Sequence, residues 1–423
     1  MKSIRANILA LYVWQAAQYA IPILTIPVLA HSLGVAGFGD VAVALNFAMY
    51  FTVVTEWGFN LSATQQVARA ADSREELRHI FWNTVLARVM LAAVCLIAAA
   101  ILPIVVPALG RVSTLIWIAS IQVVGTAITT NWFLQGLEKM GTFSTISIIG
   151  RIVVIPLTFI FVRGPDDAWV AVAIQTGSVL LIGACGFIIS LNLRPLLPIH
   201  FAPRGALAKI SEGVHLFSSQ AAVTMYAQTN VVILGILSGS AAAGIFNGGD
   251  RIRRAAQAAI GPISTALYPR VSVLALTDPA AAFKLIRRAL IAQGGLSLCV
   301  SIAIFVFADL VVNVLLGKEF GEAATILRIL SPVPLLVGIN NVLGTQILLP
   351  FGKAKTFSTI IIVCGLFNIV SLVALCPRLG AVGAASSIVM TEALVTGAMA
   401  IFALSVALSV KGRRIPPPQA PGA

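Results

Sequence analysis

Nine charged side chains interrupt long apolar stretches of this sequence, and their types indicate what they could bind. Six are arginines and three are acidic: Arg88, Arg151, Arg251, Arg253, Arg254 and Arg328, with Glu56, Asp250 and Glu392. A guanidinium group stays charged and donates paired hydrogen bonds to phosphate or carboxylate oxygens. The excess of cations over anions therefore favours an anionic ligand over a cationic one.

The stretches around these charges are suited to lipid. Of the 423 residues, 59% are hydrophobic and 10% are charged, whereas a soluble domain carries about 25% charged residues. A soluble fold of this length could not bury so much apolar surface. We therefore expect an all-α integral membrane protein.

A spanning helix needs about 20 apolar residues, and twelve segments meet that length. They lie at approximately 8–30, 39–62, 81–106, 113–134, 142–162, 168–191, 212–237, 241–271, 286–308, 323–349, 356–376 and 381–409. Of the lysines and arginines, 18 lie in one set of alternating connections and 4 in the other. Since positive residues stay on the cytoplasmic side, both termini are expected to be cytoplasmic.

The longest connection, near residues 192–211, divides these spans into two sets of six. We predict an N-terminal six-helix bundle at 1–200, a C-terminal six-helix bundle at 201–410 and a basic, proline-rich cytoplasmic tail at 411–423. An even number of spans in each half gives both halves the same orientation, as in a parallel repeat. The segments SLGVAGFGDVA at 32–42 and SGSAAAGIFNGG at 238–249 are a weak internal echo of that repeat.

The arginines within spans need a cavity or ionic partners. A charge at the centre of the bilayer costs about 2.5–3.5 kcal/mol, so three on one span would cost roughly 8–10 kcal/mol against lipid. The i, i+4 spacing of Asp250 and Arg254 predicts one local pair, which leaves Arg251 and Arg253 without a local partner. A cationic substrate cavity is one interpretation; pairing across helices or snorkelling to an interface is the other.

The remaining candidates have two interpretations each. Glu56, Asp250 and Glu392 either balance the arginines or couple transport to an ion. Amide side chains in or beside the spans are candidate sugar contacts or interhelical hydrogen bonds; those we select for sugar are Asn60, Gln135, Gln228 and Asn230, and Gln122 also lies within a span.

Several function classes are excluded by the pattern. The five cysteines are scattered and form no CxxC motif, so no metal site is expected. No nucleophile–base constellation or phosphate-binding glycine loop occurs, so we expect neither an enzyme nor a cofactor. Most basic residues lie in the short segments that connect the predicted spans, so no basic surface remains that could bind nucleic acid.

Three segments resemble a known family. They are EWGFNLSATQQVA at Glu56–Ala68, WFLQGLEKM at Trp132–Met140 and LLGKEFGEAATILRIL at Leu315–Leu330. They are similar to the O-antigen and polysaccharide flippases (Wzx/RfbX-like) of the MATE-like (MOP) exporter superfamily. The resemblance implies two six-helix bundles around a central cavity, working by alternating access.

The resemblance also implies a substrate and a place. Such proteins move undecaprenyl-pyrophosphate-linked oligosaccharides across the bacterial inner membrane for O-antigen, capsule or exopolysaccharide synthesis. The implied partners are the polyprenyl-pyrophosphate-linked glycan and the bilayer, with polysaccharide polymerase and chain-length machinery as further candidates. A MATE-type drug/cation antiporter is an alternative that predicts an acid-rich cavity, and a membrane-bound polymerase or ligase is an alternative that predicts a large outer loop.

Overall fold

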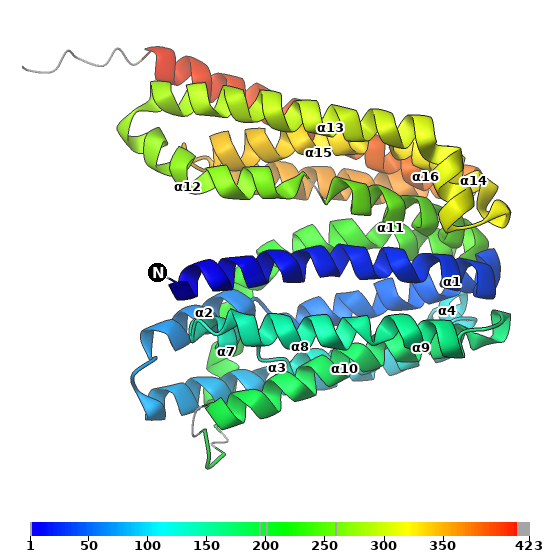
Figure 1. The fold of residues 1–423 in the computed structure, drawn as a ribbon, viewed down its shortest axis with the longest axis horizontal. Helices are drawn as coiled ribbons and strands as arrows, with labels where there is room; N and C mark the ends of the chain where they lie inside the picture. The colour runs from blue at the N-terminus through cyan, green and yellow to red at the C-terminus, as the bar shows by residue number, and fades with distance from the viewer. Residues whose placement is uncertain (1, 194–195, 200–201, 259, 413–423) are drawn as a thin grey trace, which may run out of the picture.

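The computed structural model describes residues 2–193, 196–199, 202–258 and 260–412. Within these ranges the chain forms helices and no β-strand, as the composition predicts. The predicted tail at 411–423 lies almost entirely outside the described residues. Figure 1 shows long helices lying side by side along the longest axis of the molecule.

Three long helices each consist of two arms that meet at a glycine. They are α1 (Lys2–Glu56), α11 (Pro203–Gln257) and α16 (Ala354–Gly412). The φ angle is 65° at Gly34, 85° at Gly239 and 53° at Gly380, a region that glycine enters without a steric penalty. In Figure 1 the arms of α1 and α16 run to one end of the molecule and back. We call this end the kinked end.

The other helices are shorter, and several together fill one predicted span. In the first half they are α2 (Phe59–Arg69), α3 (Arg74–Val105), α4 (Pro107–Gly110), α5 (Ser113–Ala119), α6 (Ile121–Ile128), α7 (Asn131–Gly136), α8 (Met140–Ile152), α9 (Val154–Phe161), the 3-10 turn η1 (Pro165–Asp167) and α10 (Ala168–Leu193). In the second half they are α12 (Gly261–Thr277), α13 (Pro279–Leu315), the 3-10 turn η2 (Lys318–Phe320), α14 (Gly321–Leu330), α15 (Val333–Asn341) and the π-helix η3 (Val342–Leu348).

Nine regions of the described chain are long and apolar enough to cross a membrane. Three of them contain the glycines at which α1, α11 and α16 turn. If each turn marks a return through the bilayer, the nine regions accommodate the twelve predicted passes. The exact number of passes and the cytoplasmic location of the termini stay predictions.

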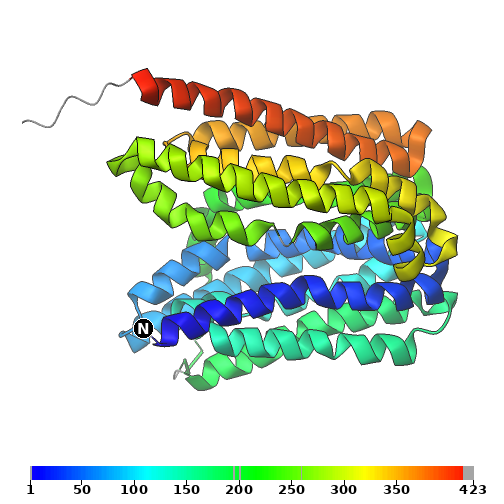
Figure 2. The ribbon, with the colours of Figure 1, turned by 45° about the horizontal axis from the view of Figure 1, so that its top comes forward.

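The helices form two groups with α1 and α11 between them. Figures 1 and 2 show the remaining helices up to α10 on one side of these two and α12 to α16 on the other. The largest buried apolar cluster crosses this boundary and includes Phe38, Phe246 and Phe320. The first arm of α11 also packs on the end of α1, where the Trp57 and Phe217 rings stack 4.0 Å apart.

The outer surface of the bundle is apolar. Ile104 is 74% exposed, Leu276 is 85% exposed and Ile401 is 69% exposed. Water would oppose an outward apolar surface of this extent, whereas lipid tails would solvate it. The fold therefore agrees with the expected all-α membrane protein.

Candidate functional site

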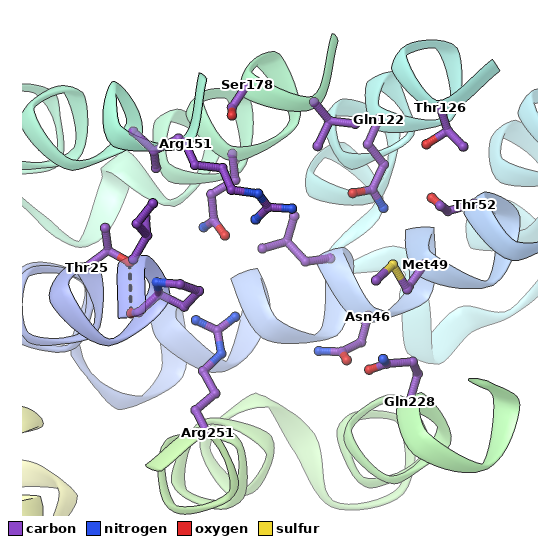
Figure 3. Close-up of a pocket in the computed structure, with 16 residues that line it drawn as sticks. Thr25, Asn46, Met49, Thr52, Gln122, Thr126, Arg151, Ser178, Gln228 and Arg251 are labelled. Carbon is purple, nitrogen blue, oxygen red and sulfur yellow. Dashed lines mark hydrogen bonds between the residues drawn. The ribbon is translucent and has the colours of Figure 1, made fainter. Parts of the chain in front are cut away.

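A cavity of about 370 Å³ lies between α1, α6, α8, α9, α10 and α11. Its volume is within the range of about 300–1,000 Å³ that is usual for small-molecule sites. Figure 3 shows Arg151 from α8 and Arg251 from α11 pointing into it from opposite walls. A second cavity of about 320 Å³ shares Arg251, Asn46 and Gln228 with the first.

Arg251 has an aromatic contact in place of an acidic partner. Its Cζ atom lies 5.7 Å from the centroid of the Phe38 ring, which is a cation–π geometry. Among the described residues, no carboxylate lies within 4 Å of its guanidinium group. The charge of Arg251 is therefore available to a ligand in either cavity.

Arg151 reaches the same space from the last turn of α8. Its Nε atom is buried and has no hydrogen-bond partner in the described structure. An acceptor that enters the cavity could satisfy this donor.

Asp250 pairs with the other two arginines of α11. Its Oδ1 accepts hydrogen bonds from Arg253 at 2.8 and 2.6 Å, and its Oδ2 accepts one from Arg254 at 2.6 Å. The expectation that Arg253 lacks a local partner was wrong, because the i, i+3 spacing brings it to the same carboxylate. Arg254 still lines the second cavity, whereas Arg253 is buried.

The other predicted charges lie away from the two cavities. Arg88 is fully buried in α3, where its Nη1 donates to the carbonyl oxygen of Thr129 at 2.5 Å. Its Nε and Nη2 have no hydrogen-bond partner among the residues that the structure describes. The carboxylate of Glu56, at the end of α1, interacts with it electrostatically. Glu392 accepts a hydrogen bond from Asn340 at 3.0 Å and lines a separate cavity of about 290 Å³.

Arg328 pairs with Asp309 of α13. The side chains of this pair are 39% and 58% exposed, so the pair matches the interpretation of pairing across helices. This partner was not predicted from the sequence, because Asp309 is one residue beyond the predicted span 286–308.

The candidate sugar contacts are only partly brought together. Gln228 lines both cavities, whereas Asn230, two residues further along α11, is buried and lines neither. Asn60 and Gln135 belong to α2 and α7 and do not line either cavity. Side chains that the selection missed do line the larger cavity: Thr25, Asn46, Thr52, Gln122, Thr126, Gln175 and Ser178. Polar pairs at i, i+3 or i, i+4 on apolar helices are the signal that could have found several of them.

Near the kinked end, the backbones of α1 and α11 approach so closely that Gly39 and Gly244 have no room for a side chain. A Cβ atom at Gly39 would lie 1.8 Å from the carbonyl oxygen of Ser240, and one at Gly244 would lie 2.2 Å from that of Val35. We call the contact formed by Val35, Gly39, Ser240 and Gly244 the glycine seam. Both segments of the predicted internal echo, 32–42 and 238–249, thus pack against each other.

Polar and aromatic contacts flank the glycine seam. Ser240 makes hydrogen bonds with Asp40 and Arg111, and Arg111 lies 3.6 Å from the carboxylate of Asp40. Phe38 packs edge to face on Phe320, with ring centroids 5.6 Å apart. Because Arg251 lies over Phe38, the Phe38 ring contacts both the arginine of the cavity and the Phe320 ring beside the glycine seam.

Comparison with known proteins decides the family. The model of the family described as "Polysaccharide biosynthesis protein" matches residues 4–275, which is more than half of the chain. This chain belongs to that family. A relative from Escherichia coli (strain K12), which carries the name "Putative O-antigen transporter", is 32% identical over 400 residues and covers 95% of this chain and 96% of the relative. The resemblance drawn from the sequence motifs is thereby confirmed.

Solved structures share the fold at low sequence identity. An inward-facing multidrug resistance MATE family transporter of the MOP superfamily has a TM-score of 0.69 at 15% identity, covering 97% of this chain and 100% of that chain. The lipid II flippase MurJ in an inward closed conformation has a TM-score of 0.68 at 13% identity, covering 94% and 87%. The chain is therefore a multi-pass, all-α membrane protein with MATE-like architecture.

Proposed function

We propose that this protein translocates undecaprenyl-pyrophosphate-linked oligosaccharide repeat units across the bacterial inner membrane for surface polysaccharide biosynthesis. The observation that carries the proposal is the pair Arg151 and Arg251, which point into one cavity without a carboxylate within 4 Å among the described residues. A pyrophosphate diester carries about two negative charges and offers acceptor edges that suit two guanidinium groups. The family and the name of the E. coli relative support the same substrate class.

The proposed mechanism is alternating access. With the termini in the cytoplasm, the glycine seam lies toward the outer face and closes the cavity there. The pyrophosphate and its glycan enter from the cytoplasmic side, while the lipid tail stays in the bilayer. The halves 1–200 and 201–410 then rock, the seam separates and the headgroup leaves. Positive charge along this route lowers the cost of moving the pyrophosphate through a medium of low dielectric constant.

Arg251 connects headgroup binding to the seam in this mechanism. Its guanidinium lies over Phe38, and Phe38 packs on Phe320 across the boundary between the helix groups. A pyrophosphate that engages the guanidinium competes with the aromatic contact. Occupancy of the cavity would thereby loosen one contact that holds the seam closed.

Two features of the structure argue against the drug/cation antiporter and against the polymerase or ligase. A drug/cation antiporter needs a carboxylate in its cavity, but the residues lining this one include two arginines and no Asp or Glu. A polymerase or ligase needs reacting side chains at the outer face, and the described residues there provide hydrogen bonds that close the seam. Polysaccharide polymerase and chain-length proteins remain proposed partners.

Deletion of the gene is expected to trap its substrate. The lipid-linked repeat unit should accumulate on the cytoplasmic side, and surface polysaccharide should be lost until the intact chain is restored. Mass spectrometry of extracted polyprenyl lipids identifies the accumulated glycan. Normal surface polysaccharide without any accumulated intermediate would count against the proposal.

Glu392 is the proposed site of ion coupling. It lines a cavity that is distinct from the arginine site and accepts a hydrogen bond from Asn340. We expect Glu392→Gln to keep substrate binding but to lose the acceleration of transport by a proton or sodium gradient. Transport in vesicles with and without each gradient measures this effect. Wild-type transport that ignores every gradient would remove the coupling role.

A further inference from the structure

The wall of the larger cavity that α6 contributes contains an unused hydrogen-bond donor. Gln122 is 9% exposed, and its Nε2 atom is buried without a hydrogen-bond partner in the described structure. Figure 3 shows its amide pointing into the cavity, on the same side as Arg151. A buried donor that lacks an acceptor costs about 1–3 kcal/mol, so an acceptor oxygen placed there would relieve that cost.

Two polar neighbours of Gln122, which α10 contributes to the same cavity, already have partners. Ser178 of α10 donates to the carbonyl oxygen of Gly150 at 2.8 Å. Gln175 donates to the carbonyl oxygen of Ala171 at 3.4 Å. Gln122 therefore differs from both of these polar groups, because its amide hydrogens are free for a ligand.

The charged side chains that line the cavity limit the chemical class of the ligand group that Gln122 can bind. The residues lining this cavity include no carboxylate, and both ionised side chains among them are arginines. A positively charged group would meet like charges at short range in a region of low dielectric constant. A neutral group that offers oxygen acceptors, such as a hydroxyl or an acetamido carbonyl, would meet only favourable partners.

We propose that Gln122 is a specificity-determining residue that binds an acceptor oxygen of the sugar joined to the pyrophosphate. This inference rests on the proposed function, because Arg151 and Arg251 must hold the pyrophosphate beside this wall. The α6 wall then selects a neutral, acceptor-rich sugar and disfavours one that carries a free amine. The arginines provide affinity for every lipid pyrophosphate, and Gln122 distinguishes among the sugars attached to it.

The test compares three substrates in vesicles that contain the purified full-length protein. They are undecaprenyl pyrophosphate without a sugar, with N-acetylglucosamine and with glucosamine, whose amine is positively charged. For the wild type we expect the N-acetylated substrate to move faster than the amine. Gln122→Leu should slow the N-acetylated substrate by about threefold to tenfold, the effect of one hydrogen bond, and leave the substrate without a sugar unchanged.

Gln175→Leu is the matched control, because Gln175 lines the same cavity but already donates to Ala171. It should leave the ratio between the N-acetylated and sugar-free substrates unchanged. Transport of the sugar-free lipid also reports that each variant is folded. An unchanged ratio in Gln122→Leu would overturn the inference while leaving the flippase intact. A wild-type protein that moves none of the three substrates would instead contradict the proposed function.

Discussion

Arg251→Gln is expected to slow translocation of the lipid-linked oligosaccharide by about 10- to 100-fold. Hydrogen bonds to charged groups contribute about 1.5–3 kcal/mol, and this variant removes the charge and the paired donors while keeping a polar side chain. The loss should appear mainly as weaker binding of the pyrophosphate. The measurement is the initial rate of translocation in vesicles at several substrate concentrations.

Two further variants separate the role of the Arg251 charge from general damage. Arg328→Gln is the matched control, because Arg328 pairs with Asp309 on a partly exposed surface outside the cavities. Such pairs contribute about 0–1 kcal/mol, so transport should be nearly normal. Arg151→Gln should resemble Arg251→Gln, and the double variant should be inactive. Normal transport by Arg251→Gln would show that the facing arginines do not bind the headgroup.

Gly39→Val is expected to abolish transport by holding the glycine seam apart. Its Cβ would lie 1.8 Å from the carbonyl oxygen of Ser240, so α1 and α11 must separate at this contact. The seam would then be unable to close and the cycle would stop with the outer side open. The measurement uses Ser240→Cys in a chain whose native cysteines are replaced. With Gly39→Val, this cysteine should react with a membrane-impermeant maleimide at least about tenfold faster than it does in the same chain with Gly39.

The control for the Gly39 variant is a glycine with open space around it. No heavy atom lies within 4 Å of a Cβ built on Gly294 of α13, so Gly294→Val should transport normally. If Gly39→Val transports as well as Gly294→Val, the seam does not close the cavity during the cycle.

The membrane architecture could be predicted because it depends on local properties of the sequence. Apolar length indicated where the chain crosses lipid, and the structure has helices in every predicted span. The local ion pair of Asp250 with Arg254 also followed from helical spacing. Breaks within spans were not predicted, such as the one at Val153 between α8 and α9, because hydropathy does not respond to a local change in helix geometry.

The composition of the site depended on packing that the sequence does not display. Arg151 and Arg251 are far apart along the chain, and their shared cavity results from the way α8 and α11 pack around α1. The contribution of Gln122 was equally hidden, because sequence shows that an amide lies in a span but not whether its hydrogens are used. The meeting of Gly39 with Ser240 required both helix reversals, so the two echo segments indicated a repeat without indicating their contact.

The most direct measurement of the central claim is leaflet exchange of a defined undecaprenyl-pyrophosphate-linked oligosaccharide in vesicles that contain only this protein. An enzyme that modifies the glycan from outside reports how much substrate has crossed. We predict rapid exchange with the wild-type protein and strongly reduced exchange with Arg151→Gln combined with Arg251→Gln. Equal exchange by the folded wild-type and double-variant proteins, or none beyond protein-free vesicles for either, would contradict the account.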